Sequence, residues 1–334
     1  MMANLRAGLI GLGMMGRHHA RVLQSLDGVD LVAVADPTGD PHGVAGDREV
    51  LSGVTALIDT GIDYCVVAVP TAFHHGIAME LAAAGVAALI EKPLAATSAE
   101  ADEIVAAFDS AGLVGGVGHI ERYNPALQQA RARLEAGDLG EVFQVSTRRV
   151  GPFPARIADV GVVKDLGTHD IDLTAWVTQQ QYATVAAHTA HRSGRPHEDL
   201  VAITGQLTGG TVTNHLVNWL SPMKERLTVI TGEKGAFVAD TLSADLTYYA
   251  NGSVPTEWTQ IAGFRGVSEG DMIRYSFPKP EPLRTEHEAF RDAVLGQPSR
   301  IVSLAEGART LAVAEAVLES AATGTTVRCA AAVS

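Results

Sequence analysis

The stretch Gly11-Leu12-Gly13-Met14-Met15-Gly16 decides the fold of this 334-residue chain. It follows the apolar run Leu5–Ile10 and opens a helical pattern that continues to about Leu26. In a strand–turn–helix unit, the first glycine permits a tight turn, the second lets the backbone approach a pyrophosphate, and the third lets helix and strand pack closely. The amides of Met14 and Met15 at the helix start are the expected pyrophosphate donors. The stretch therefore predicts a dinucleotide-binding unit.

Asp36 strengthens this interpretation because it follows the third glycine at about 20 residues, the spacing of the acid that binds a ribose. It ends the apolar run Val29–Ala35, and its carboxylate would accept hydrogen bonds from a ribose 2′-hydroxyl but repel a 2′-phosphate. Residues 37–39 are Pro-Thr-Gly and contain no arginine to neutralise a phosphate. We therefore predict NAD rather than NADP as the cofactor. The alternative is that Asp36-Pro37 only starts a turn.

The rest of the first 118 residues alternates continuous apolar runs with helical patterns. Strands are predicted at 29–35, 64–69, 86–90 and 113–117, and helices at 73–84 and 98–111. Residues 37–53 are rich in glycine, proline and polar side chains, so we expect a loop there. Apolar strands without alternation, separated by helices, are typical of a parallel sheet that is covered on both faces.

The pattern changes after His119. A helix is predicted at 125–136 and two more at 283–295 and 304–322. Alternating strands are predicted at 184–190, 200–207, 211–220 and 226–231, with turns at 209–210 and 232–235. We therefore predict an α/β protein in which a doubly wound Rossmann domain (1–120) precedes a substrate-binding and oligomerisation domain (121–330). The second domain is expected to contain a large open, mostly antiparallel sheet.

Composition narrows the class of protein. The net charge of −13 argues against a nucleic-acid surface, which needs a clustered basic face. We find no apolar stretch long enough for a membrane helix and no pattern of a secretory signal. Cys65 and Cys329 have no CxxC partner, and the scattered histidines have no metal-site spacing. We expect a soluble cytoplasmic protein without a metal ion.

Two further elements carry acid–base chemistry. Glu91-Lys92-Pro93 follows a predicted parallel strand, at the sheet edge where open α/β folds bind ligands. Asp165 and His169 are four residues apart, which places them on one face of a predicted helix, and Asp172 lies one turn further. An imidazole beside carboxylates is a candidate general base near neutral pH. The alternative is a capping aspartate and an exposed histidine.

With these elements, the chain resembles the Gfo/Idh/MocA family of oxidoreductases. The resemblance covers nearly the whole chain, including Val69-Pro70-Thr71 with His74, residues 91–93 and residues 165–169. It implies a Rossmann domain followed by an α/β domain with a large open sheet, a homo-oligomer (dimer or tetramer), and Lys92, Asp165 and His169 as the catalytic set. The cofactor-binding residues would be those of the glycine loop together with Asp36, Pro70, Thr71, His74, Glu91 and Lys92.

Longer strings resemble nucleotide-sugar 3-dehydrogenases of that family, UDP-N-acetylglucosamine 3-dehydrogenases in particular. These strings are residues 118–125, 151–161 and 217–226. The expected substrate-binding residues are Arg122, Tyr123, Asn124, Arg156, Asp165 and His169. Arginine and lysine side chains, including Lys224 and Arg226, suit a diphosphate, and Tyr123 and Trp219 suit a sugar or a base. The alternatives are that Arg226 is a strand-surface charge and that Trp219 belongs to the core.

The sequence thus predicts an NAD-dependent dehydrogenase acting on a sugar hydroxyl, C3 of a UDP-N-acetylhexosamine or a related nucleotide sugar. His169 would take the proton of the reacting hydroxyl, oriented by Asp165 or Asp172, while Lys92 would stabilise the same oxygen. One alternative is an inositol or free-sugar dehydrogenase of the same family. Another is a non-catalytic NAD-binding sensor, for which all three catalytic side chains would be unnecessary.

Overall fold

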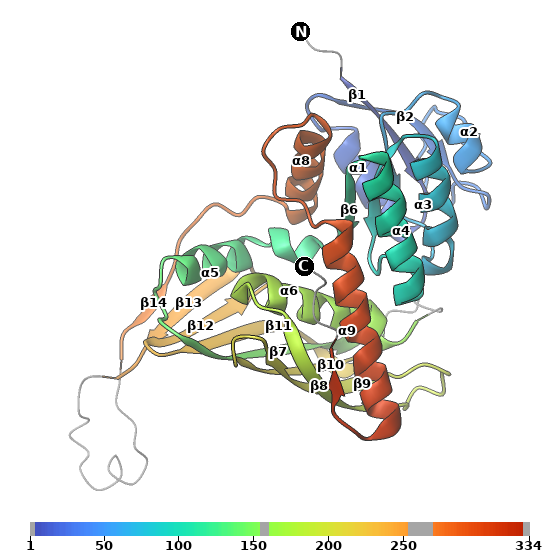
Figure 1. Ribbon diagram of the computed structural model, residues 1–334. Helices are drawn as coiled ribbons and strands as arrows, with labels where there is room; N and C mark the ends of the chain where they lie inside the picture. The colour runs from blue at the N-terminus through green and yellow to red at the C-terminus, as the bar shows by residue number, and fades with distance from the viewer. Residues whose placement is uncertain (1–3, 154–159, 253–269, 330–334) are drawn as a thin grey trace, which may run out of the picture. The chain divides into compact units, whose positions relative to one another are not determined.

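The computed structural model describes residues 4–153, 160–252 and 270–329 (Figure 1). Contacts between Cα atoms divide the chain into two compact units, one made of residues 1–120 and 281–315 and the other of residues 121–280 and 316–334. The first boundary lies where the sequence pattern changes. Residues 281–315 group with the first unit, although the sequence analysis assigned them to the second domain.

The first unit contains a six-stranded sheet in which every pair of neighbouring strands is parallel. Its strands are β1 (Leu5–Ile10), β2 (Val29–Ala35), β3 (Val50–Leu51), β4 (Tyr64–Val67), β5 (Ala87–Glu91) and β6 (Gly115–Gly118). They follow the order β3-β2-β1-β4-β5-β6, which is the dinucleotide-binding arrangement. The predicted parallel sheet is confirmed. The prediction of a loop over residues 37–53 missed β3, because this two-residue edge strand has no apolar run of its own.

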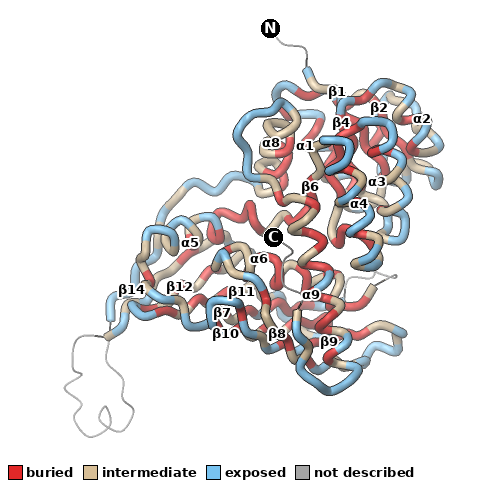
Figure 2. Tube along the Cα trace, viewed as in Figure 1, coloured by how far each residue is buried: buried red, intermediate tan, exposed pale blue. Residues whose placement is uncertain are grey.

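Helices line this sheet. They are α1 (Met14–Leu23), α2 (Val54–Ile58), α3 (His74–Ala83), α4 (Ser98–Ala111), α8 (Pro282–Val294) and the part of α9 (Leu304–Thr323) up to residue 315. α1 contacts α8, whereas α3 contacts α2 and α4. The side chain of Phe290 from α8 packs edge-on against Tyr64 of β4, with the ring centroids 5.5 Å apart. Figure 2 shows the buried core strands of this unit in red.

Local signals explain where these helices begin and end. The side chain of Thr97 accepts a hydrogen bond from the backbone N–H of Glu100, whose own side chain returns to the Thr97 backbone, so α4 starts with a capping box. α4 stops at Gly112, which has φ 63°, a conformation that glycine adopts without a Cβ penalty. α8 starts with Pro282, whose missing N–H costs nothing at this position.

The second unit is built on a nine-stranded mixed sheet. Its strands are β7 (Val142–Pro152), β8 (Tyr182–Ala190), β9 (Leu200–Leu207), β10 (Val212–Asn218), β11 (Leu220–Gly232), β12 (Gly235–Asp240), β13 (Asp245–Ala250), β14 (Met272–Arg274) and β15 (Val327–Arg328). Their order is β14-β13-β12-β11-β7-β10-β9-β8-β15, and β7–β10 is the parallel pair among the described strands of this sheet. The predicted open, mostly antiparallel sheet is confirmed, as are the turns at 209–210 and 232–235.

Two helices cover one face of this sheet. α5 (Pro125–Glu135) contributes Leu127 and α6 (Thr168–Thr178) contributes Leu173 to a core that includes Phe237 of β12. β11 begins six residues before its predicted start, because a register shift between Leu220 and Glu225 interrupts the alternation there. Within the described parts of the chain, we find no helix of the length and apolarity that a membrane span requires.

Candidate active site

The glycine loop between β1 and α1 has the shape that a pyrophosphate needs. A Cβ on Gly16 would lie 1.9 Å from the carbonyl oxygen of Gly11, so helix and strand pack closely only with glycine there. A Cβ on Gly13 would meet no protein atom within 4 Å, which leaves open space in front of the loop. Gly13 is also the N-cap of α1 and provides no capping side chain. The first amides of α1 are thus open to an anion.

Asp36 follows β2, as predicted, and its carboxylate is held in place. It accepts hydrogen bonds from the Leu12 N–H (2.8 Å) and from both the N–H and the hydroxyl of Thr38 (2.8 and 2.6 Å). Burial disfavours the charged form, but these bonds outweigh burial and lower the pKa of Asp36 below its ordinary value. Asp36 is therefore an anion that already ties the glycine loop to the next loop, with lone pairs left for a ribose hydroxyl.

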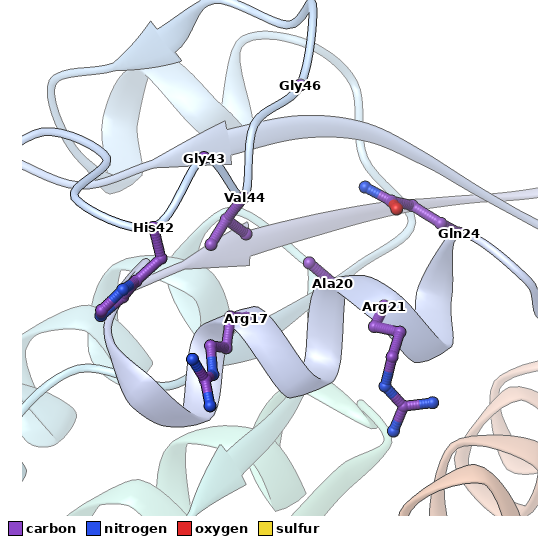
Figure 3. Close-up of a pocket in the computed structure, with 8 residues that line it drawn as sticks. All are labelled: Arg17, Ala20, Arg21, Gln24, His42, Gly43, Val44 and Gly46. Carbon is purple, nitrogen blue, oxygen red and sulfur yellow. The ribbon is translucent and has the colours of Figure 1, made fainter.

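A pocket of about 260 Å³ lies beside α1 and the loop that follows Asp36. The lining side chains include Arg17 and Arg21 of α1 and His42 of the loop (Figure 3). Residues 37–39 contain no cation, but α1 brings the positive charges of Arg17 and Arg21 to this loop, which the local sequence did not indicate. Arg21 is also ion-paired with Glu281.

His74, which is predicted to bind the cofactor, is buried between two loops. It is 1% exposed, and its two ring nitrogens each lie 3.0 Å from a main-chain carbonyl oxygen, that of Val69 and that of Pro93. Burial lowers the pKa of His74, so the ring is neutral at pH 7 and donates to one carbonyl at a time. Its role is to join the loop after β4, which contains Pro70 and Thr71, to the loop after β5.

Lys92 lies at the carboxyl end of β5, the ligand-binding edge of a doubly wound sheet, and the Lys92–Pro93 peptide bond is cis. Glu91, predicted to bind the cofactor, is directed elsewhere. Its carboxylate accepts a hydrogen bond from the Lys92 N–H (3.1 Å) and contacts the ring of His19 (2.9 Å). Glu91 therefore supports the backbone that carries Lys92.

The second unit contributes Asp165 and His169. Asp165 belongs to a short π-helix, Val163–Gly167, which continues directly into α6, where His169 is the second residue. Asp165 is 4% exposed and His169 is half-buried. The carboxylate of Glu198 accepts a hydrogen bond from the Val163 N–H (3.0 Å) and fixes the start of this segment. π-Helical turns inside helices are frequent at functional sites.

Arg122 and Asn124, which are predicted to bind the substrate, have hydrogen-bond partners within the second unit. The guanidinium of Arg122 forms two hydrogen bonds with the carboxylate of Asp172 (2.8 and 2.7 Å), and these side chains are 8% and 1% exposed. Asn124 caps α5 through the Ala126 N–H and donates to the carbonyl of Thr241. Tyr123 is 6% exposed. Asp172 is thus the partner of Arg122.

Sequence reasoning missed a second buried cluster beside Asp165. Arg149 of β7 is 3% exposed and is ion-paired with Asp170 (3.1 Å) and Glu121 (2.9 Å). The two carboxylates outweigh burial and raise the pKa of Arg149. Burial and the charge of Arg149 lower the pKa of Arg226. Arginine and aspartate are common on strands and helices, so nothing in the sequence pairs these residues before the fold does.

The end of β7 brings three further side chains together. The guanidinium of Arg195 lies 4.5 Å from the ring centroid of Phe153 and 5.1 Å from that of Trp219. Trp219 is 3% exposed, so the core alternative describes it better than an open stacking surface. Arg226 donates to the main-chain carbonyls of Val150 and Glu225. Arg156 lies outside the described residues.

The described residues contain no cluster of three or more histidine, cysteine, aspartate or glutamate side chains arranged for a metal ion. Comparison with known proteins places this geometry in context. Residues 5–119 match the oxidoreductase family with an NAD-binding Rossmann fold named Gfo/Idh/MocA, and residues 127–238 match its C-terminal domain. Both parts of the chain therefore point to one family.

The similarity to individual relatives covers nearly the whole chain. The chain is 31% identical to inositol 2-dehydrogenase 2 of Saccharopolyspora erythraea, across 96% of this chain and 94% of that protein. It is 28% identical to UDP-N-acetylglucosamine 3-dehydrogenase of Acidithiobacillus ferrooxidans, across 94% and 96%. A solved structure of the latter enzyme superposes with a TM-score of 0.83 at 27% identity, covering 96% of this chain and 98% of that one. This chain belongs to the Gfo/Idh/MocA family and is an NAD-dependent dehydrogenase.

Proposed function

We propose that the protein oxidises the C3 hydroxyl of a UDP-N-acetylhexosamine or a related nucleotide sugar to a ketone, with NAD as the hydride acceptor. One observation carries the proposal: Lys92 follows the carboxyl end of β5, and Asp165 and His169 lie where a π-helix continues into α6. The similarity to UDP-N-acetylglucosamine 3-dehydrogenase over nearly the whole chain supports the nucleotide sugar.

Each catalytic side chain has one task in this proposal. The imidazole of His169 accepts the proton of the reacting hydroxyl, and the carboxylate of Asp165 orients the ring. The ammonium of Lys92 donates a hydrogen bond to the same oxygen and stabilises the negative charge that develops there. NAD, when bound, supplies the carbon that receives the hydride from the sugar. The C–H and O–H bonds of the alcohol are thus replaced by a C=O bond.

The cationic side chains of the second unit support a substrate that carries a diphosphate. Arg122 is paired with Asp172, whereas the guanidinium of Arg226 donates to the main-chain carbonyls of Val150 and Glu225. Lys224 is exposed on the same strand, β11, and a Cβ on Gly151 would lie within 3.9 Å of atoms of both side chains. Arginine and lysine placed together in this way suit phosphate oxygens.

An inositol dehydrogenase is the second candidate, and the 31% identity to inositol 2-dehydrogenase 2 favours it. The two candidates differ in what they require of Lys224 and Arg226. A neutral polyol has no group for a cationic pair to bind, whereas removal of either charge would raise the KM for a nucleotide sugar.

The experiment is an assay of NADH formation with UDP-N-acetylglucosamine, UDP-N-acetylgalactosamine, dTDP-glucose, glucose, myo-inositol and scyllo-inositol. The proposal expects turnover with a UDP-N-acetylhexosamine, a KM that rises about tenfold in Lys224→Ala, and normal NADH binding in that variant. Turnover of inositol alone would support the second candidate. NADH binding without turnover of any sugar or polyol would point to a sensor.

Variants at the catalytic positions complete the test. Lys92→Ala and His169→Ala should each lower kcat by roughly 100-fold or more and leave NADH affinity nearly unchanged. Matched controls are Lys234→Ala, at the exposed turn between β11 and β12, and His188→Ala, at an exposed position of β8. A Lys92 or His169 variant that retains most of its activity would contradict the role assigned to that residue.

We also propose that the chain forms a homo-oligomer through the open face of its second sheet. On β9, Val201, Ile203 and Leu207 are buried, whereas Ala202 and Thr204 are exposed on the other face. A second subunit would cover such small side chains without a large desolvation cost. Analytical ultracentrifugation distinguishes a dimer or tetramer from a monomer, and Ala202→Arg should shift the distribution toward monomer.

A further inference from the structure

A row of buried polar side chains runs through the first unit behind Glu91. The Nε2 atom of His19 lies 2.9 Å from Oε1 of Glu91, and the Nδ1 atom of His19 lies 2.9 Å from Nε2 of His287. His19 belongs to α1, Glu91 to the end of β5 and His287 to α8, so three distant segments of the chain meet here. Both histidines are 0% exposed, and the Glu91 side chain is 11% exposed.

The protonation states give this row a direction. Burial raises the pKa of Glu91, but its contacts with His19 and Lys92 outweigh burial, so the pKa is lower than usual and the group is an anion. An anion only accepts hydrogen bonds, so His19 donates its Nε2–H to Glu91. Burial and the neighbouring His19 lower the pKa of His287 well below its ordinary value. His287 is therefore neutral, and its Nε2 atom shares a hydrogen bond with Nδ1 of His19, which in turn donates to Glu91.

The row ends at the backbone of Lys92. The second carboxylate oxygen of Glu91, Oε2, accepts a hydrogen bond from the Lys92 N–H at 3.1 Å. Gly118 of β6 leaves the space that this carboxylate occupies, because a Cβ at that position would lie 3.2 Å from Oε2. A carboxylate whose Oε1 is held by His19 therefore fixes the position in which Oε2 accepts from the Lys92 amide.

Burial of two imidazoles and a carboxylate is costly, and a backbone N–H at a sheet edge is satisfied as well by water. A buried network of this kind restricts its members to a single geometry when each donor meets an acceptor. We propose that His19 and His287 are positioning residues of the dehydrogenase reaction, which hold Lys92 in place through the carboxylate of Glu91. The inference rests on the catalytic role proposed for Lys92.

Paired substitutions separate positioning from packing, because each amide side chain imitates one ring nitrogen. In His19→Gln the amide nitrogen takes the place of Nε2 and keeps the bond to Glu91. In His19→Asn it takes the place of Nδ1 and loses that bond. For the next link, His287→Gln keeps a hydrogen-bonding partner for Nδ1 of His19 and His287→Leu removes it. Glu286→Gln serves as the control, because Glu286 is a 1% exposed neighbour of His287 and burial raises its pKa well above the ordinary value, which favours the neutral form that Gln imitates.

The first measurement is steady-state kinetics of the full-length protein with the best substrate of the panel above, together with thermal unfolding. We expect His19→Asn and His287→Leu to lower kcat by roughly 10- to 100-fold with little change in the KM for NAD, since a small displacement of a reacting group has effects of this size. His19→Gln, His287→Gln and Glu286→Gln should remain within about threefold of the unaltered protein. If the loss of kcat is proportional to the loss of melting temperature across all five variants, the proposal is overturned.

The second measurement needs no substrate. Hydrogen–deuterium exchange of the Lys92 amide reports directly on its bond to Glu91. We expect exchange to be at least about tenfold faster in His19→Asn than in His19→Gln. Equal exchange in the two variants would refute the inference, even if Lys92→Ala abolished turnover. An active Lys92→Ala variant combined with fast exchange in His19→Asn would instead refute the catalytic role of Lys92 and leave the support of its backbone standing.

Discussion

Removal of the Asp172 carboxylate is expected to destabilise the second unit severely. In Asp172→Ala, the guanidinium of Arg122 would stay 7% exposed and lose a partner that accepts two hydrogen bonds from it. Breaking a buried ion pair on one side typically costs about 3–5 kcal/mol, because the remaining charge is left without compensation. For a unit of this size, the loss corresponds to a fall in melting temperature on the order of 10 °C.

The assay is unfolding in urea followed by tryptophan fluorescence. All three tryptophans of the chain lie within residues 121–280, so the signal reports the second unit. The matched control is Glu135→Gln, which removes the partner of Arg131 in an exposed ion pair on α5 and should cost no more than about 0.5 kcal/mol.

The double variant Arg122→Leu/Asp172→Leu keeps the reasoning testable if Asp172→Ala does not fold. Replacing both charges removes the uncompensated guanidinium, so the double variant should recover most of the lost stability. A loss below about 1 kcal/mol in Asp172→Ala would refute the reasoning. An Arg122→Leu variant of normal stability with a raised KM for a UDP-sugar would return Arg122 to the substrate site.

Three further predictions concern the cofactor loop and the acid stability of the fold. Gly16→Ala forces a Cβ to 1.9 Å from the Gly11 carbonyl oxygen and should lower both thermal stability and NADH binding, whereas Gly13→Ala meets no protein atom and should weaken NADH binding alone, as calorimetry would show. Asp36→Ser removes the anion at the ribose and should reduce the preference for NADH over NADPH roughly 10- to 100-fold, as competitive titration would show. Burial lowers the pKa of His215 to about 3, below its ordinary value of 6.5 when unfolded, so the stability from its neutral form is complete above pH 6.5 and falls as the pH drops toward 3. The free energy of unfolding, measured in urea, should therefore be about 2 kcal/mol lower at pH 5 than at pH 7 because of His215. His215→Gln should reduce this dependence of stability on pH. An unchanged dependence would show that other groups cause it.

The Rossmann half of the fold could be predicted from sequence because its signals are local. The glycines of the first loop act within a single strand–turn–helix unit, and α4 has both a capping box and a terminal glycine within its own segment. The grouping of α8 with the first unit could not be predicted, for the opposite reason. Its helical pattern was clear, but its partner, the surface around Tyr64, lies more than two hundred residues earlier, and no local feature names it.

In the candidate site too, local features could be predicted from sequence and long-range contacts could not. The chemical type and place of Lys92, Asp165 and His169 followed from short motifs, since the end of a parallel strand and a helical spacing of four are local geometry. Short motifs did not predict the partners of Arg122, His74 and the Glu91 carboxylate. A charged or polar side chain in a motif is equally compatible with a ligand and with a buried protein partner. Only the folded chain shows which of these groups are already satisfied.

Because α8 and the first part of α9 belong to the amino-terminal unit, this unit cannot complete its fold early in translation. During translation, residues 1–120 leave the ribosome while the helix that carries Phe290 is still about 170 codons away. Until then, β4 and β6 lack the aromatic side chain that packs against Tyr64 and near Gly116. The apolar surface of the nascent nucleotide-binding half thus stays exposed until α8 is synthesised. A chaperone can bind this surface during that interval.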